Sequence, residues 1–162
     1  MSRAIATFFW IGCLPGAPGT WGALAALPVA WAIYVTAGLW AFLVATVVVT
    51  LIGWWATVEE TRTGDPDPSE IVIDEVAGQW IALWPVLIGA AHAGADPLRL
   101  WPGWLAAFVL FRLFDIWKPG PVRWADRMHT PWGIMLDDVL AGILAAIGVA
   151  ALAALAHGVL GI

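Results

Sequence analysis

Five long apolar segments dominate this chain and leave few folds open to it. They lie near residues 22–37, 39–58, 76–91, 101–117 and 136–160. The hydrocarbon core of a bilayer is about 30 Å thick, and a helix needs roughly 20 apolar residues to cross it. Open strands leave backbone groups without partners in lipid, and the segments show no alternating barrel pattern. The sequence therefore predicts an all-α, polytopic integral membrane bundle of four to five spans, with room for one re-entrant or tilted segment.

The composition indicates a single membrane domain that covers residues 1–162. Hydrophobic residues make up 62% of the chain and charged residues only 12%, so little sequence remains for anything beside the spans. The start, MSRAIATFFWIGC, is predicted to form a short hydrophobic or interfacial helix. The only cysteine, Cys13, excludes an internal disulfide. The stretch around Asp65 and Asp67 is interpreted as a proline-broken surface loop, because no calcium-loop pattern follows.

The basic residues predict the orientation of the bundle. With the N-terminus inside and five crossings, one end collects Arg3, Arg62, Lys118, Arg123 and Arg127, and Arg99 alone lies at the other. Basic residues favour the cytoplasmic side of a membrane. The acidic residues other than Asp96 fall on the same side, so we expect the chemistry at the cytoplasmic face. No nucleic-acid partner is expected, and the sequence does not fix the oligomeric state.

Two similar acidic motifs are the strongest sign of chemistry. IVIDEVAG contains Asp74 and Glu75, and IMLDDVLAG contains Asp137 and Asp138. Each pair is predicted to open an apolar helix, where carboxylates complement the positive end of the helix dipole. Adjacent carboxylates near a membrane are costly and repel each other, and a cation relieves both costs. Capping together with water-facing charges is the alternative interpretation.

Each motif also places a glycine, Gly78 or Gly142, four residues after one of its acids. Acid and glycine then share a helix face, and the glycine lets another helix approach closely. We therefore expect the two helices to pack together with their acids converging. Four carboxylates without a supporting histidine or cysteine cluster favour a hard, oxygen-seeking ion such as Mg²⁺, with some of the acids as direct ligands.

Basic and glycine-rich segments supply candidate phosphate contacts. FRLFDIWKP places Arg112, Asp115 and Lys118 three residues apart along one helix face, where the cations can hold a phosphate or simply neutralise the acid. Arg123, in the next segment, is a weaker candidate for anionic headgroups. LPGAPGTWGAL, residues 14–24, offers backbone N–H groups to an anion, with plain turn chemistry as the alternative.

Four stretches together carry a family resemblance. APGTWG, DEVAGQW, FRLFDIWKPGPVRWAD and GIMLDDVLAG, in this order, resemble the phosphatidylglycerophosphatase A family over about residues 12–150. The resemblance implies a Mg²⁺-dependent lipid phosphatase of the bacterial inner membrane. Such an enzyme releases the terminal phosphate of phosphatidylglycerophosphate at the cytoplasmic face and leaves phosphatidylglycerol. Ala23 and Ala77 depart from the expected pattern, which leaves Thr20 as the hydroxyl candidate in the glycine-rich stretch.

Residues and resemblance together predict a division of roles. The predicted metal ligands are Asp74, Glu75, Asp137 and Asp138. The predicted catalytic residues are these four acids and Asp115. The predicted substrate contacts are Thr20, Arg112, Lys118 and Arg123. Asp115 is expected to orient the cations or act as a general base, and the nucleophile is either water or a carboxylate. The competing function is a small ion or metabolite transporter, whose acids would instead be spread through the membrane depth.

Overall fold

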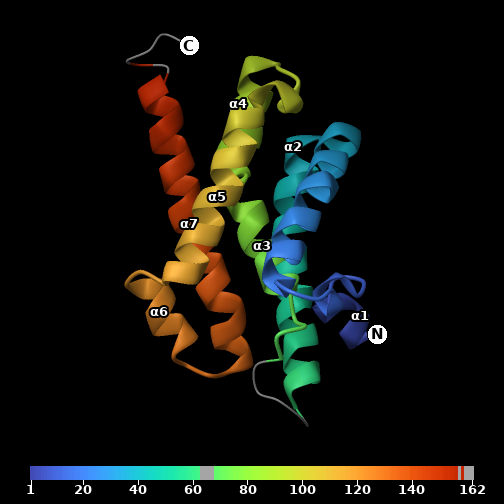
Figure 1. Cartoon of the computed structure of the whole chain (residues 1–162). Coiled ribbons are helices and arrows are strands. Elements are labelled where there is room, and N and C mark those ends of the chain that lie inside the picture. The colour runs from blue at the N-terminus through green and yellow to red at the C-terminus, as the bar shows by residue number, and fades with distance from the viewer. Residues whose placement is uncertain (63–67, 157, 159–162) are drawn as a thin grey trace.

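The computed structural model describes residues 1–62, 68–156 and 158, and these residues form a bundle of helices (Figure 1). The helices are α1 (Ser2–Ala6), η1 (Ile11–Cys13), α2 (Pro18–Thr61), α3 (Ile73–Ala82), α4 (Trp84–Ala93), η2 (Pro97–Leu100), α5 (Trp101–Trp117), α6 (Pro121–Asp126) and α7 (Pro131–Leu155). No strand occurs in these described ranges, so the predicted all-α class is confirmed. The predicted loop at Asp65 and Asp67 lies outside the described residues.

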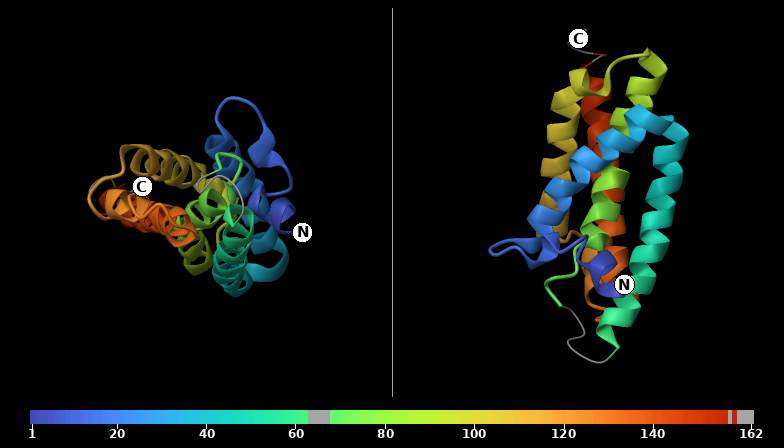
Figure 2. Two further views of the ribbon diagram at one scale, coloured as in Figure 1. Left: turned by 90° about the horizontal axis from the view of Figure 1, so that it is seen from below. Right: turned by 90° about the vertical axis from the view of Figure 1, so that its right-hand side faces the viewer.

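Helix α2 consists of two arms that run in opposite directions. Gly38 has φ 82° and ψ 178°, a backbone conformation that glycine adopts readily, and the chain turns back there (Figure 2). The break falls in the predicted gap between the first two apolar runs. Within the described residues, three helices are long and apolar enough to cross a membrane, or four if the bent pair α3–α4 is one span. Counting both arms of α2 gives the predicted four to five spans.

The apolar run near residues 76–91 is two helices, where the sequence predicted one. α3 ends at Ala82, α4 begins at Trp84, and their axes are bent by 41°. Pro85 lies in the first turn of α4. Proline has no N–H group to donate to the preceding turn, and its ring crowds that turn, so the helix breaks there.

The predicted start of the last helix was also wrong. Helix α7 begins at Pro131, because Thr130 caps it by accepting a hydrogen bond from the Gly133 N–H at 3.1 Å and proline suits the first helical position. Asp137 and Asp138 therefore lie more than a turn inside the helix, beyond the reach of its positive end. Asp74 and Glu75, in contrast, do lie in the first turn of α3 as predicted.

Helix α3 lies at the centre of the bundle and meets α7 through two glycines. Every residue of α3 except Glu75 is buried. A β-carbon at Gly142 would overlap the carbonyl oxygen of Gly78, and one at Gly78 would lie 2.5 Å from the carbonyl oxygen of Asp138. The backbones of α3 and α7 thus touch where the sequence predicted a close approach. This contact brings the two acidic motifs together.

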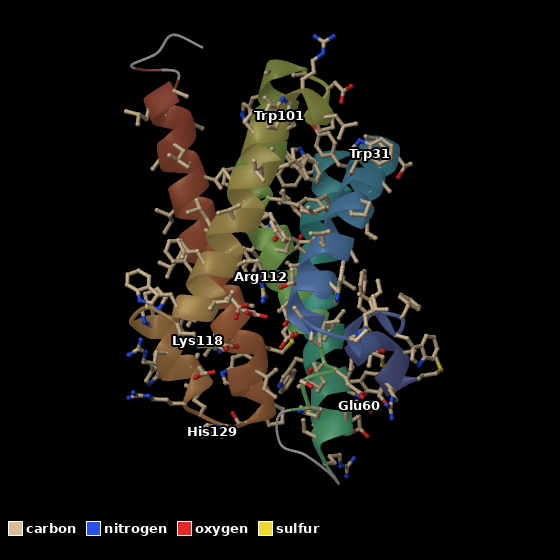
Figure 3. The ribbon with its side chains drawn as sticks, viewed as in Figure 1. Trp31, Glu60, Trp101, Arg112, Lys118 and His129 are labelled. Carbon is tan, nitrogen blue, oxygen red and sulfur yellow. The ribbon has the colours of Figure 1, made fainter. Side chains whose placement is uncertain are left out.

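The two ends of the bundle differ in charge. Glu60, Lys118 and His129 lie toward one end, and Trp31 and Trp101 lie toward the other (Figure 3). The first end contains α1, α6 and the last turn of α2 (Figure 1). Arg3 lies in α1, Arg123 lies in α6, and Arg62 directly follows α2. Arg99 belongs to η2 at the opposite end. The basic residues are therefore separated as predicted.

Candidate active site

A cavity of about 400 Å³ opens where α2 and α3 begin, α5 ends and α7 passes by. Its lining includes seven of the predicted site residues: Asp74, Glu75, Arg112, Asp115, Lys118, Asp137 and Asp138. In Figure 3, Arg112 and Lys118 come from the lower part of α5 and its end. Thr20 and Arg123 are not among the described residues that line the cavity.

The acids of the cavity form two overlapping groups. Carboxylate oxygens of Asp74, Glu75 and Asp138 lie within 4.8 Å of one another, and the same limit holds for Asp115, Asp137 and Asp138. The predicted convergence of acids from α3 and α7 is thus present. Asp138 belongs to both groups and lies at their centre. Asp115 joins the second group, although the sequence assigned it only an orienting or general-base role.

The two acidic pairs share the same local hydrogen bonding. Asp74 Oδ1 accepts the N–H of Glu75 at 3.0 Å, and Asp137 Oδ1 accepts the N–H of Asp138 at 3.0 Å. The second acid of each pair keeps a buried oxygen, Glu75 Oε2 or Asp138 Oδ1, that no described residue satisfies. A buried carboxylate oxygen without a partner is costly. Two such oxygens from different helices, in a group made only of carboxylates, fit a hard divalent cation such as Mg²⁺.

Arg112 lies between the acids and the start of α2. Its Nη1 is 2.5 Å from Asp115 Oδ2, while its buried Nε has no partner among the described residues. A β-carbon at Gly19 would overlap Glu75 Oε1 and lie 3.1 Å from Arg112 Nη1. Gly19 thus lets the first turn of α2 approach both side chains. The glycine-rich stretch contributes backbone next to the site through Gly19, whereas Thr20 is not among the described lining residues.

Lys118 is held by two acids from different helices. Its Nζ donates to Asp126 Oδ1 at 2.5 Å and to Asp137 Oδ2 at 2.6 Å. Burial lowers the pKa of Lys118, but the hydrogen bonds and charges of these two carboxylates outweigh burial and hold its pKa above the ordinary value. Lys118 is therefore a permanent cation at physiological pH.

Two further residues near Lys118 are Asp126 and Arg123, of which the sequence predicted only Arg123 as a substrate contact. Asp126 was missed as a site residue, and the only signal for it was its place in the stretch PVRWAD. Arg123 donates from Nε to the carbonyl of Lys118 at 3.3 Å and from Nη2 to that of Trp117 at 3.4 Å. Its guanidinium thus satisfies carbonyl groups at the end of α5.

A sequence model of phosphatidylglycerophosphatase A matches residues 4–153, nearly the whole chain. The chain belongs to the phosphatidylglycerophosphatase A family. The predicted family is therefore confirmed, and with it the class of the chain, an enzyme that removes phosphate from a lipid. The seven cavity residues predicted from the family's motifs meet in one place on this fold.

Three bacterial proteins are similar to this phosphatidylglycerophosphatase A family member. A protein of Haemophilus influenzae named phosphatidylglycerophosphatase A is 39% identical over 91% of this chain and 86% of its own. The protein of that name in Escherichia coli (strain K12) is 35% identical over 88% of this chain and 77% of its own. A Bacteroides thetaiotaomicron protein named "Putative phosphatidylinositol-3-phosphatase" is 41% identical over 86% of this chain and 85% of its own. No solved structure is significantly similar to the chain.

Lys118 offers a direct chemical test of this site, because it is the only lysine in the sequence. Acylating reagents attack the neutral amine, so a raised pKa slows the reaction. At about pH 9 we expect acylation at least about tenfold slower than for free Nα-acetyl-lysine, since one pKa unit changes the neutral fraction tenfold. Asp126→Asn should speed the reaction. Mass spectrometry of the peptide that contains Lys118 gives the acylation rate in the parent and in the variant. Equal acylation rates for the parent protein and free Nα-acetyl-lysine would contradict the ion pairs.

Proposed function

We propose that the chain hydrolyses the terminal phosphate monoester of phosphatidylglycerophosphate to phosphatidylglycerol and inorganic phosphate, with Mg²⁺ as its cofactor. The names of the relatives from Escherichia coli and Haemophilus influenzae support the substrate. The observation that carries the proposal is the cavity itself, in which two cations and a carboxylate cluster from separate helices face one space. The same clustering of acids counts against the transporter alternative, which needs them along a path.

The charge of the cavity supports the need for a divalent cation. Six acids and two basic residues line it, which leaves an excess of four formal negative charges. A phosphate dianion would be repelled by such a site. Asp74, Glu75 and Asp138 would hold Mg²⁺, with Asp137 and Asp115 beside them. When bound, the ion supplies positive charge and Lewis acidity at the phosphate.

The protein's own groups position the phosphate and move the proton. Arg112 and Lys118 bind phosphate oxygens, and Asp115 fixes the Arg112 guanidinium through the 2.5 Å ion pair. A water attacks phosphorus and gives a proton to Asp115, and the bond from phosphorus to the glycerol oxygen breaks. The proton then passes to that leaving oxygen, so the products are a lipid alcohol and inorganic phosphate.

We also propose that the site faces the cytoplasm from a bacterial inner membrane. Arg3 lies in α1, Arg123 lies in α6, and Arg62 and Lys118 directly follow α2 and α5, all at the end of the bundle where the cavity opens. Clustered basic residues at the ends of spans favour the cytoplasmic side. The opposite end carries Arg99.

Removal of the metal is expected to abolish the activity. In detergent micelles that contain phosphatidylglycerophosphate, we expect EDTA to lower phosphate release at least about 100-fold, because the excess negative charge is then left unbalanced. Added Mg²⁺ should restore the rate, and colorimetric phosphate release measures it. Activity that persists in chelator would overturn the metal assignment.

The same assay decides the substrate. Phosphatidylinositol 3-phosphate and phosphatidic acid, at equal mole fraction, are the matched comparisons. Faster phosphate release from either of these lipids would show that it, and not phosphatidylglycerophosphate, is the preferred substrate. Ion flux in vesicles without phosphate release from any of the three lipids would support a transporter instead.

A further inference from the structure

We propose that the substrate's acyl chains enter from the membrane between the start of α2 and the end of α5, and that they lie along an apolar stripe on α5 that ends at Ile116. This inference rests on the proposed lipid phosphatase activity. It adds the route by which the acyl chains enter and the surface on which they lie. It makes Ile116 a residue that positions the substrate without contacting the phosphate.

The cavity is too small for a whole lipid. Its volume of about 400 Å³ holds roughly a dozen groups of about 30 Å³, the volume of one water molecule in the liquid. A glycerol phosphate headgroup fits such a space. Two long acyl chains do not, so they must leave the cavity across its rim and remain in lipid.

The residues that line the cavity divide into polar and apolar ones. His129 and Ser69 are exposed lining residues, and His129 lies toward the charged end of the bundle (Figure 3). The apolar lining residues are Ala17 and Pro18 at the start of α2, Ile116 on α5, and Pro68, Ile71 and Ile134. A phospholipid needs this division, because its phosphate borders water and its tails do not.

Ile116 connects the cavity to the outer surface of α5. Among the described residues that line the cavity, it is the only large apolar side chain that is exposed, at 72%. It follows Arg112 by four residues, so both side chains lie on neighbouring parts of one helix face. The tail-binding position is therefore one helical turn from the proposed phosphate contact.

An exposed apolar stripe continues from Ile116 along α5. Leu105, Val109 and Leu113 are exposed and follow one another at four-residue intervals, and Ile116 comes three residues later. Residues at these spacings line one side of a helix. Of the exposed large apolar side chains among the described residues, which include Ile147 on α7, Ile116 alone also lines the cavity. Continuity with the headgroup cavity thus selects the α5 stripe for the acyl chains.

The decisive experiment compares a long-chain lipid with a short-chain one. Ile116→Asn is expected to lower kcat/KM for long-chain phosphatidylglycerophosphate about tenfold, through loss of apolar contact with the tails. It should change kcat/KM for the water-soluble dihexanoyl form less than about twofold. Ile147→Asn is the matched control, since Ile147 is also an isoleucine on the apolar outer surface of a helix and is 61% exposed. We expect it to leave both values within about twofold of the parent.

Each outcome bears on the proposal. If Ile116→Asn lowers kcat/KM equally for both substrates, Ile116 acts on the reacting group and not on the tails. If both variants lower kcat/KM equally, the effect is a general one of a polar residue in lipid. Either result overturns the proposed route. Parent protein that hydrolyses neither lipid would instead refute the proposed function. Should Ile116→Asn fail to fold, the parent protein decides, with a phosphatidylglycerophosphate that carries a photoreactive acyl chain. Competable labelling of the α5 peptide supports the route, and labelling of α7 alone refutes it.

Discussion

Asp138→Asn is expected to reduce phosphate release from phosphatidylglycerophosphate at least about 100-fold and to leave the protein folded. Asp138 is the one residue shared by both carboxylate groups, and its buried Oδ1 has no partner among the described residues. The amide has nearly the same shape but lacks the negative charge that a divalent ion requires. Losses of this size are usual when a group that stabilises transition-state charge is removed.

The same substitution, Asp138→Asn, is expected to keep or raise the thermal stability of the protein while it lowers the activity. Asp138 is buried beside Asp74, Asp115 and Asp137, so removal of its charge relieves repulsion and desolvation. Thermal unfolding in detergent that contains EDTA, and so without the ion, is expected at the parent's temperature or above. Asp96→Asn is the matched control, because asparagine retains an oxygen for the Leu98 N–H that Asp96 accepts at 2.9 Å. Parent-like activity in Asp138→Asn would remove this residue from the metal site.

Gly142→Ala is expected to disrupt the site without touching a charged group. The added β-carbon would overlap the carbonyl oxygen of Gly78 and lie 3.0 Å from its Cα and carbonyl carbon. Backbone atoms cannot swing aside as a side chain does, so α3 and α7 must separate. Overpacking of this kind costs about 1–3 kcal/mol, and the separation moves Asp138 away from Asp74 and Glu75. We expect a lower unfolding temperature and an activity loss of at least about tenfold.

Gly89→Ala provides the control for this change. Gly89 lies within α4, and a β-carbon there would have open space around it. Alanine favours a helix over glycine by about 1 kcal/mol, so this variant should be as stable as the parent or more so. Thermal unfolding and phosphate release, measured for both variants, test the contact. A stable and active Gly142→Ala protein would show that the close approach of α3 and α7 is not needed.

The features that the sequence predicted depend on local rules. The four-residue spacing of acids and glycines indicates a shared helix face whatever the fold, and this spacing correctly predicted the contact at Gly78 and Gly142. Proline signals were present for both errors in helix limits, because Pro85 marks the break after α3 and Thr130 with Pro131 marks the start of α7. These signals were outweighed by the continuous apolar runs.

The missed features depend on how distant segments meet. Asp126 reaches Lys118 because the chain turns after α5 and α6 folds back toward the cavity. Asp115 approaches Asp138 only because α5 and α7 pack side by side. The partnerless oxygens of Glu75 and Asp138 were also invisible, since they depend on which backbone groups remain free after packing. None of these features has a fixed spacing in the sequence.

If the bent pair α3–α4 forms one span, its length fixes the depth of the candidate site in the membrane. α3 and α4 contain ten residues each and rise about 15 Å apiece, so together they match the thickness of the hydrocarbon layer. Asp74 and Glu75, at the foot of α3, then lie at the plane where hydrocarbon meets the headgroups. The phosphate of a resting lipid already lies near this plane. Such an enzyme has no need to lift its substrate out of the leaflet.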